Sequence, residues 1–366
     1  MNADEFPVEV DQKAEAALAM LPVPSALAKL GITEVYLYSL PMRMRFRGIM
    51  QRQGVLLQGP TGWGEFSPFT EYEVPEASNW LLSAIEAATL TELPRLPLHL
   101  NIGINLTVPV VSADRAQELA AASGATTAKI KVADPNSTLA EDCARVEAVA
   151  ATLGPQAKIR VDANTAWDVE TAVHAIKELD RAAQLGAGGG VLSPPGVTGL
   201  DYVEQPCATL PELAAVRNQV PVRIAADESI RRASDPAEAI RLRAADVMVV
   251  KVQPLGGTQR CLDLLAGEDV QVVVSSALES SIGIAHGVRL ASMLPNLAGD
   301  CGLGTVRLFT AEVSRSVLLP HGNQIALADA LTTATQGVQP VHGSIPATQR
   351  AWWLKRIEEC LTYLGF

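Results

Sequence analysis

The fold is decided by short apolar segments that recur along the middle of the chain: AKIKVA (128–133), KIRVDAN (158–164), DYVEQP (201–206), VRIAADES (222–229), DVMVVKV (246–252) and VQVVVSS (270–276). Each segment is rich in residues that favour strands, and helix-length stretches separate them. Six strand-end residues, from Lys131 to Ser275, follow one another at intervals of 31, 42, 23, 24 and 24 residues. A strand, a crossover helix and two loops need roughly 25–30 residues. The spacing therefore predicts consecutive βα units, with the Gly/Pro-rich residues 185–200 as a long surface loop.

Polar residues at the strand ends choose between the two folds that such units build. From the segment at 128–133 onward, each apolar run ends in a charged or hydroxyl residue at its C-terminal side. A closed barrel gathers all these ends around one mouth, whereas an open doubly wound sheet has its chemistry at one switch point. The pattern favours a barrel.

The first hundred residues predict a smaller α+β unit. Residues 17–30 suggest a helical lead-in broken by prolines, residues 32–40 and 48–59 two strands, and residues 77–89 a helix. Between the strands we expect a basic loop from Pro41 to Arg47. The glycines of TGWGEFSPF (61–69) suggest a break in regular structure.

Composition excludes several classes of protein. Of the 366 residues, 48% are hydrophobic and 19% charged, which is the balance of a globular enzyme. A net charge of −11 argues against a nucleic-acid partner. No apolar run is long enough to span a membrane, the acidic start does not resemble a secretory signal, and five scattered cysteines suit a reducing compartment. We expect a cytoplasmic location.

Three acids lie at the ends of successive predicted strands: Asp162, Glu204 and Asp227. Carboxylates are costly to bury beside apolar strands unless a cation compensates them. Oxygen ligands with no nearby His or Cys favour Mg²⁺ over zinc. The alternative is that each acid separately caps a helix or pairs with an arginine, but three in a row at barrel spacing favour the metal site.

Lysines flank the acids on both sides. Lys129 and Lys131 are two residues apart on one strand and therefore share a face, and Lys251 ends the predicted strand of DVMVVKV (246–252). Lysine is rarely buried, so we expect either a functional role or a side chain that reaches solvent from the strand end. A partly desolvated lysine beside a divalent cation has a lowered pKa and can act as a base near neutral pH. The lysines lie on opposite sides of the mouth and, with the metal, form an acid–base set.

Taken together, KIKVADPNS (129–137), RVDAN, VEQP, ADES, VVKVQPLGG (249–257) and SSALESSIG (275–283) resemble the enolase superfamily, in its muconate-lactonizing subgroup, and within it the o-succinylbenzoate synthase family. The resemblance runs from about residue 33 to beyond residue 300. It implies a modified TIM (β/α)7β barrel with an α+β capping domain. The parts would be a capping domain at 1–100, the barrel at 101–305 and a segment at 306–366 that completes both.

The resemblance also implies roles for individual residues. Asp162, Glu204 and Asp227 would bind Mg²⁺, with Mn²⁺ as a substitute. Lys131 would be the base, Lys129 would support it, and Lys251 would be a cation on the opposite face. The implied reaction of menaquinone biosynthesis dehydrates 2-succinyl-6-hydroxy-2,4-cyclohexadiene-1-carboxylate to 2-succinylbenzoate. The only partner implied is this small carboxylate, with no nucleic acid, membrane or protein partner.

Substrate contacts are expected from five further residues: Asn164, Arg160, Ser275, Ser276 and Arg45. For Arg160, pairing with an acid is an equal alternative. For Arg45 in the basic loop, the alternative is a solvated charge. Two alternatives for the whole protein stay open: N-succinylamino acid racemisation, which also uses two opposed lysines, and a metal-binding barrel without activity.

Overall fold

The computed structural model describes residues 15–46, 48–90, 92–188, 199–231, 236–341 and 343–366. No helix within these ranges is both long and apolar enough to cross a membrane. The predicted loop at 185–200 lies largely outside the described residues, which stop at residue 188 and continue at residue 199. Its first two residues belong to α5 (Val169–Gly186).

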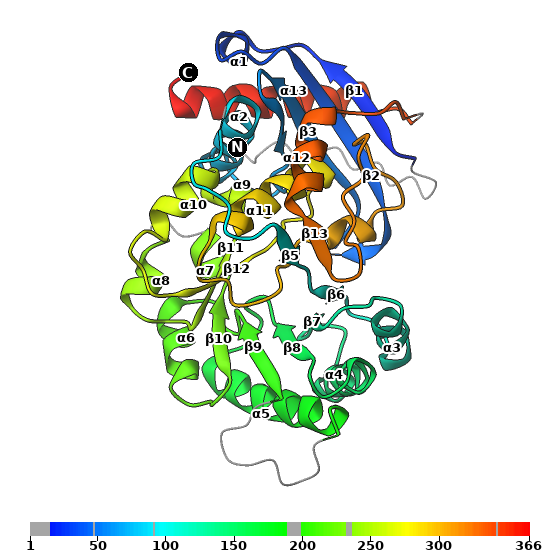
Figure 1. Ribbon diagram of the computed structural model, residues 1–366, viewed down its shortest axis with the longest axis vertical. Coiled ribbons are helices and arrows are strands. Elements are labelled where there is room, and N and C mark those ends of the chain that lie inside the picture. The colour runs from blue at the N-terminus through cyan, green and yellow to red at the C-terminus, as the bar shows by residue number, and fades with distance from the viewer. Residues whose placement is uncertain (1–14, 47, 91, 189–198, 232–235, 342) are drawn as a thin grey trace.

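Seven parallel strands form the predicted barrel sheet, in the order β12-β11-β10-β9-β8-β7-β6 (Figure 1). Their bounds are β6 (Leu106–Val108), β7 (Thr127–Lys131), β8 (Lys158–Asp162), β9 (Leu200–Glu204), β10 (Arg223–Ala226), β11 (Val247–Val250) and β12 (Gln271–Val274). Residues 297–302 take the eighth position, since Gly302 pairs in parallel with Ser275 after β12 and Cys301 with Ile104 before β6. The α/β barrel expected from the sequence is confirmed.

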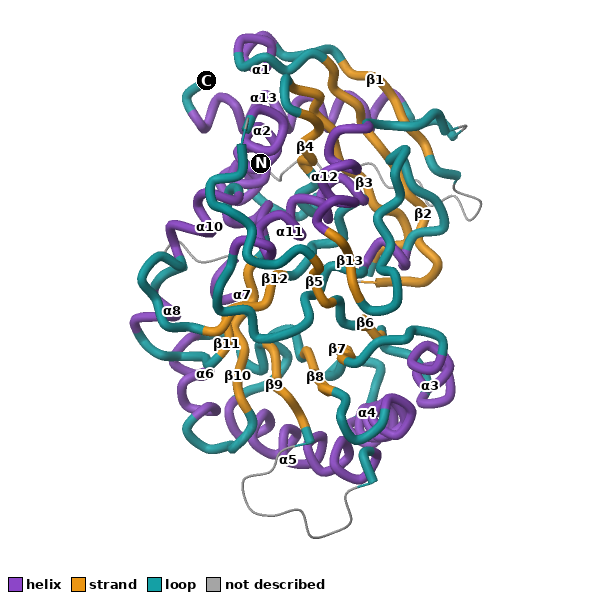
Figure 2. Tube along the Cα trace, viewed as in Figure 1, coloured by secondary structure: helices purple, strands orange, loops and turns teal. Residues whose placement is uncertain are grey.

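Helices cover the outside of this barrel (Figure 2). They are α3 (Ala113–Ala121), α4 (Leu139–Leu153), α5, α6 (Leu210–Arg217), α7 (Glu228–Arg231), α8 (Glu238–Arg241), α9 (Val252–Leu255), α10 (Thr258–Leu264) and α11 (Ser281–Met293). Local sequence sets two of their starts, because Thr138 and Thr209 each form a reciprocal capping box with the glutamate three residues later. Alternate strand residues such as Ile130 and Ile224 pack against the helices, while Tyr202 and Val249 fill the barrel interior.

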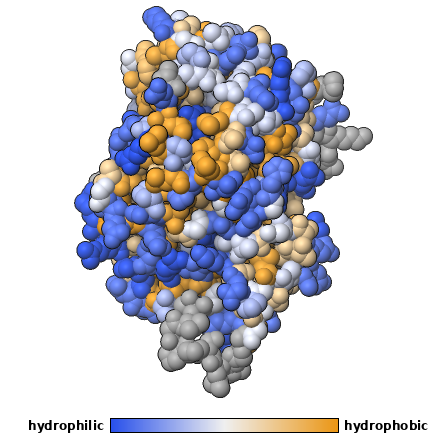
Figure 3. Space-filling model, in the orientation of Figure 1, coloured by the Kyte–Doolittle hydropathy of each residue, from blue (hydrophilic) through white to orange (hydrophobic). Residues whose placement is uncertain are grey.

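The capping domain is an antiparallel sheet in the order β1-β2-β3-β4 with its own apolar core. Its elements are β1 (Ala17–Leu21), α1 (Ser25–Lys29), β2 (Glu34–Phe46), β3 (Ile49–Gly59), β4 (Gly62–Phe66), α2 (Val74–Thr89) and α13 (Ala347–Leu364). The remaining elements are β5 (Asn101–Gly103), the 3₁₀ helix η1 (Thr305–Leu308), β13 (Gln324–Ala326) and α12 (Leu327–Gln336). On the face in Figure 3, apolar residues gather over the middle, around α11 and α12, between the two cores. The domain boundaries at 100 and 305 stay a prediction.

Three local expectations for the capping domain are wrong. Residues 17–21, the first part of the expected helical lead-in, form β1 because they pair with β2, whereas residues 25–29 are helical as expected. The expected loop from Pro41 belongs to β2 as far as Phe46. Residues 62–66 form β4 rather than a break: a Cβ on Gly64 would lie 1.9 Å from the carbonyl oxygen of Ala84, so this glycine lets α2 pack closely.

A buried carboxylate joins the capping domain to the barrel. Glu65 on β4 is 1% exposed. It accepts hydrogen bonds from Tyr38 (2.7 Å) and Ser67 (2.8 Å) of the capping domain. From the barrel it accepts the hydroxyl of Ser280 (2.5 Å) and the N–H of Gly283 (3.0 Å). One carboxylate therefore accepts hydrogen bonds from donors in both domains.

Arg52 on β3 makes a second link close by. Its Nε donates to the carbonyl oxygen of Leu278 (3.0 Å) and its Nη2 to that of Ala277 (3.1 Å), and its guanidinium lies 4.4 Å from the ring centre of Phe69. Leu278 has a positive φ of 64°, so the turn after β12 is a strained backbone held by the capping domain.

We expect Glu65→Gln to lower the free energy of unfolding by about 2–4 kcal/mol. An amide accepts at one oxygen only, so the substitution turns an N–H₂ group toward at least two buried donors, each costing about 1–3 kcal/mol. The measurement is urea denaturation followed by circular dichroism. The exposed Glu71 supplies the control: Glu71→Gln should stay within about 0.5 kcal/mol of the wild type. Equal stability of the two variants would contradict the role of Glu65.

Candidate active site

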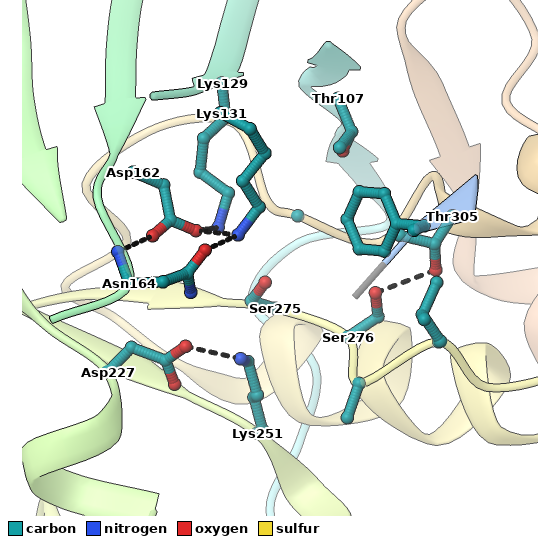
Figure 4. A pocket seen from close by; sticks show the side chains of 14 residues that line it. Thr107, Lys129, Lys131, Asp162, Asn164, Asp227, Lys251, Ser275, Ser276 and Thr305 are labelled. Carbon is teal, nitrogen blue, oxygen red and sulfur yellow. Dashed lines mark hydrogen bonds and ion pairs between the residues drawn. The ribbon is translucent and has the colours of Figure 1, made fainter. Parts of the chain in front are cut away.

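A pocket opens at the carboxyl ends of the barrel strands (Figure 4). Eight of its lining residues were predicted from the sequence: Lys129, Lys131, Asp162, Asn164, Asp227, Lys251, Ser275 and Ser276. Lys129 and Lys131 lie on one side of the pocket and Lys251 on the other, as Figure 4 shows. The barrel thus brings together side chains that are up to 147 residues apart in sequence.

The lysines of β7 contact two carboxylates. Lys131 Nζ lies 2.5 Å from Asp162 Oδ2 and 2.6 Å from Asn164 Oδ1. Lys129 Nζ donates to both oxygens of Glu204, at 2.7 and 2.9 Å, and lies 3.4 Å from Asp162. Glu204 is 0% exposed and lies behind Lys129 rather than on the pocket wall.

A second charge group lies on the other side. Lys251 Nζ is 2.6 Å from Asp227 Oδ2, and Arg231 Nε is 3.0 Å from Asp227 Oδ1. Arg231 also donates to Glu228 (2.6 Å) and to the hydroxyl of Tyr72 (2.6 Å) in the capping domain. Glu228 in turn accepts a hydrogen bond from the Asn164 amide, so it supports the site from behind.

Burial and neighbouring charges perturb the acids in opposite directions. Burial, and then the charge of Asp162, raises the pKa of Glu204 to about 7, although Lys129 opposes the rise. Burial would also raise the pKa of Asp227, but Lys251 and Arg231 outweigh it and lower this pKa to about 2. For Asp162, the two lysines of β7 likewise outweigh burial and lower the pKa.

The lysines on the two sides also differ. Burial would lower the pKa of Lys129, but the carboxylates of Glu204 and Asp162 outweigh it and raise the pKa. Burial lowers the pKa of Lys251, and Asp227 offsets this only in part. Lys129 is therefore a fixed cation, while Lys251 is the more readily deprotonated of the two.

The three acids have the chemistry of a divalent-cation site. Within the described ranges, no three His, Cys, Asp or Glu side chains are placed so that they could together hold one metal ion, because ammonium groups contact the carboxylates instead. However, Asp162 and Asp227 both raise the pKa of Glu204, so the three charges repel one another. The cluster pairs four carboxylates with four cationic side chains. A dication and a dicarboxylate can therefore enter together without net charge.

The other part of the pocket is uncharged. Ser276 Oγ and Thr305 Oγ1 are 2.8 Å apart, and Thr107 and Ser275 lie beside them. Six lining residues were not predicted from the sequence: Phe46, Thr107, Ala277, Leu278, Gly302 and Thr305. Thr107 could have been found, since it lies near the end of β6 as the predicted residues do on their strands. Phe46 carries no such signal, because only the hairpin of β2 and β3 brings it over the barrel.

Two predicted substrate contacts do not reach the pocket. Arg160 is fully buried within the barrel, where it donates to Asp201 (2.8 Å) and to the carbonyl oxygen of Asp300 (2.6 Å). Of the two roles expected for Arg160, substrate contact or pairing with an acid, the structure contains the ion pair. Arg45 is exposed on β2 and donates to the carbonyl oxygen of Gly48. The described hairpin contributes Phe46 to the pocket instead.

Comparisons with known proteins agree with this geometry. Two family models match: enolase N-terminal domain-like at residues 37–88 and enolase C-terminal domain-like at residues 111–331. An o-succinylbenzoate synthase of Thermobifida fusca is 49% identical over 286 residues, which are 78% of this chain and 84% of that protein. One of Mycolicibacterium smegmatis is 46% identical over 90% of this chain and 95% of its own length.

A solved muconate lactonizing enzyme from Pseudomonas fluorescens, complexed with muconolactone, has the same fold. It superposes with a TM-score of 0.68 at 19% identity, covering 88% of this chain and 99% of its own. The family models cover more than half of the chain, and the relatives are well above 30% identical over most of their length. The chain therefore belongs to the o-succinylbenzoate synthase family of the enolase superfamily.

Proposed function

We propose that this enzyme dehydrates 2-succinyl-6-hydroxy-2,4-cyclohexadiene-1-carboxylate to 2-succinylbenzoate, a lyase step of menaquinone biosynthesis. The observation that carries the proposal is a charged pocket end, with lysines on opposite sides, next to an uncharged hydroxyl-lined end. The charged end suits the ring carboxylate and the carbon beside it. The hydroxyl-lined end, with Ser275 and Ser276, suits the succinyl carboxylate.

Lys131 is the proposed base. Its amine takes the proton from the carbon next to the carboxylate, so the C–H bond breaks and its electron pair enters the ring system. The resulting ammonium then protonates the departing hydroxyl on the same face, the C–O bond breaks, and water leaves. Aromatisation drives this elimination, so the protein mainly supplies a base and positioning. Asn164, which accepts a hydrogen bond from Lys131, orients the amine.

The other two lysines are proposed to act by charge. Lys129 is fixed on Glu204 and Asp162, and keeps a positive charge beside the base. Lys251 lies on the opposite side of the pocket, where its charge stabilises the electrons released from the C–H bond. These roles need no proton from Lys251.

We propose Asp162, Glu204 and Asp227 as the ligands of Mg²⁺, with Mn²⁺ as a substitute. When bound, the metal would neutralise the negative charge that develops on the substrate carboxylate. The partner is a small carboxylate, and the proposed location is the cytoplasm.

Chelation tests the metal site. We expect EDTA to abolish activity and Mg²⁺ to restore it, because without the metal the negative charge that develops on the substrate carboxylate is not neutralised. Asp227→Asn should weaken Mg²⁺ binding, measured by calorimetry, together with turnover. The exposed Asp114 gives the control Asp114→Asn, which should bind Mg²⁺ like the wild type. Full activity in excess chelator would eliminate the metal assignment.

Substitution of Lys131 tests the base. We expect Lys131→Ala to reduce dehydration by about 10³-fold or more, since both proton transfers pass through this amine. Aromatic absorbance reports the rate. Lys158 is an exposed lysine at the far end of the adjacent strand, so Lys158→Ala should keep the wild-type rate. If Lys131→Ala keeps more than about a tenth of the rate, a barrier change under about 1.4 kcal/mol, the base is wrong.

Lys251 distinguishes dehydration from racemisation of N-succinylamino acids, the second candidate, which the opposed lysines favour. Racemisation needs a proton donor on the face opposite the base, whereas the proposed dehydration needs only charge there. Arginine keeps the charge but does not release a proton at neutral pH. We therefore expect Lys251→Arg to retain measurable dehydration and to lose any racemisation.

The two rates are measured side by side, with α-proton exchange in D₂O for each enantiomer of the amino-acid substrate. Some loss in both reactions is expected from the larger side chain, so the ratio is decisive. An equal loss of both activities would mean that Lys251 transfers a proton in dehydration too.

A further inference from the structure

Strand β7 ends at Lys131, and its hydrogen bonds to β8 extend only one residue further. The last paired position with β8 is Lys131 opposite Asp162, and beyond it Val132 N–H donates to the carbonyl oxygen of Asp162 (3.1 Å). The chain then turns sharply, because Ala133 has a positive φ of 62°. A residue with a Cβ rarely adopts this conformation unless its surroundings hold it there.

Two side chains of α4 hold this turn. Arg145 Nη1 donates to the carbonyl oxygen of Lys131 itself (2.9 Å), and its Nε donates to that of Val111 (2.6 Å). Asp142 Oδ2 accepts the N–H of Ala133 (2.8 Å). The two side chains also pair with each other at 2.7 Å, and both are 2% exposed.

Neither residue lines the pocket, and the pair is not needed to start α4. The capping box of Thr138 and Glu141 already satisfies the first turn of that helix. Buried ion pairs are weak evidence for stability, because desolvation offsets much of their attraction. What this pair does contribute is a set of directed hydrogen bonds to the main chain on both sides of Val132 (Lys131 C=O and Ala133 N–H).

We propose that Arg145 and Asp142 are positioning residues that fix the backbone of Lys131 and thereby aim its amine at the substrate. The inference rests on the proposed role of Lys131 as base. A lysine has a long flexible side chain, so its reactive nitrogen is placed accurately only if its main chain is fixed. A displacement of about 1 Å at a reacting group can cost on the order of 100-fold in rate.

The test substitutes Arg145→Lys, which keeps a charge beside Asp142 but cannot span the same acceptors. We expect kcat to fall about 10- to 100-fold while KM changes little, because the pocket wall itself is intact. The primary isotope effect with α-deuterated substrate should rise, since proton abstraction becomes slower relative to other steps. Asp142→Asn keeps an acceptor for Ala133 N–H and should show a smaller loss of kcat.

A matched control lies at the opposite end of the barrel. Arg217 pairs with Asp246 at 2.7 Å, and Asp246 accepts the N–H of Ile224, so this less buried pair braces the start of β10 in the same way. Arg217→Lys should change kcat less than about 2-fold even where it lowers the unfolding temperature. If Arg145→Lys and Asp142→Asn keep kcat at the level of this control, the inference is overturned.

A double-mutant comparison separates this inference from the proposed function. If Lys131 is the base and Arg145 acts through it, Arg145→Lys should lower kcat no further when Lys131→Ala is already present. An additive loss below the residual rate of Lys131→Ala, with that rate reduced about 10³-fold as proposed, overturns the positioning role alone. Full activity of Lys131→Ala overturns both the base assignment and the inference.

Discussion

The buried charges at the carboxyl ends of the strands are stable only when they form ion pairs with one another, and the rest of the structure depends on this constraint. Lys129 and Glu204 are both nearly inaccessible, and an unpaired charge there would cost several kcal/mol. Their pairing requires β7, β8 and β9 to be in register, with Lys131 opposite Asp162 and Asp162 opposite Glu204. A shift by one residue would turn the acids into the apolar layer beneath the helices. The site therefore specifies the register of the sheet that carries it.

The capping domain completes the pocket rather than merely covering it. Phe46 reaches the mouth from β2, and Lys131 Nζ lies 5.7 Å from its ring centre. Arg52 holds the turn after β12, and Glu65 collects hydrogen bonds from both domains. The pocket wall at Leu278 is therefore set by capping-domain side chains. The contacts that pack the two domains together therefore also shape the pocket that would hold the substrate.

Strained backbone marks the mouth. In the described residues, non-glycine positive φ angles occur in the turns that follow β7 (Ala133), β8 (Asn164 and Thr165), β9 (Gln205) and β12 (Leu278), and also at Arg243 before β11. Side chains from elsewhere hold two of these turns, since Asp142 accepts the N–H of Ala133 and Arg52 donates to the carbonyl oxygen of Leu278. The Gln205 amide accepts the N–H of Asp227 and so braces the neighbouring strand end. Such conformations persist where surrounding structure over-determines them, which is a common feature of functional sites.

The sequence by itself determined the barrel, the charged residues of its mouth and the resemblance to a family, because strand spacing and strand-end polarity are local, periodic signals. It could not determine what non-local pairing decides: that residues 17–21 form a strand, that Phe46 lines the pocket, or that Arg160 lies beneath it. Arg160 shares the inward face of Asp162, two residues further along β8, but depth along the barrel axis separates a pocket residue from an interior ion pair. That depth depends on the stagger of neighbouring strands, which only the tertiary structure supplies.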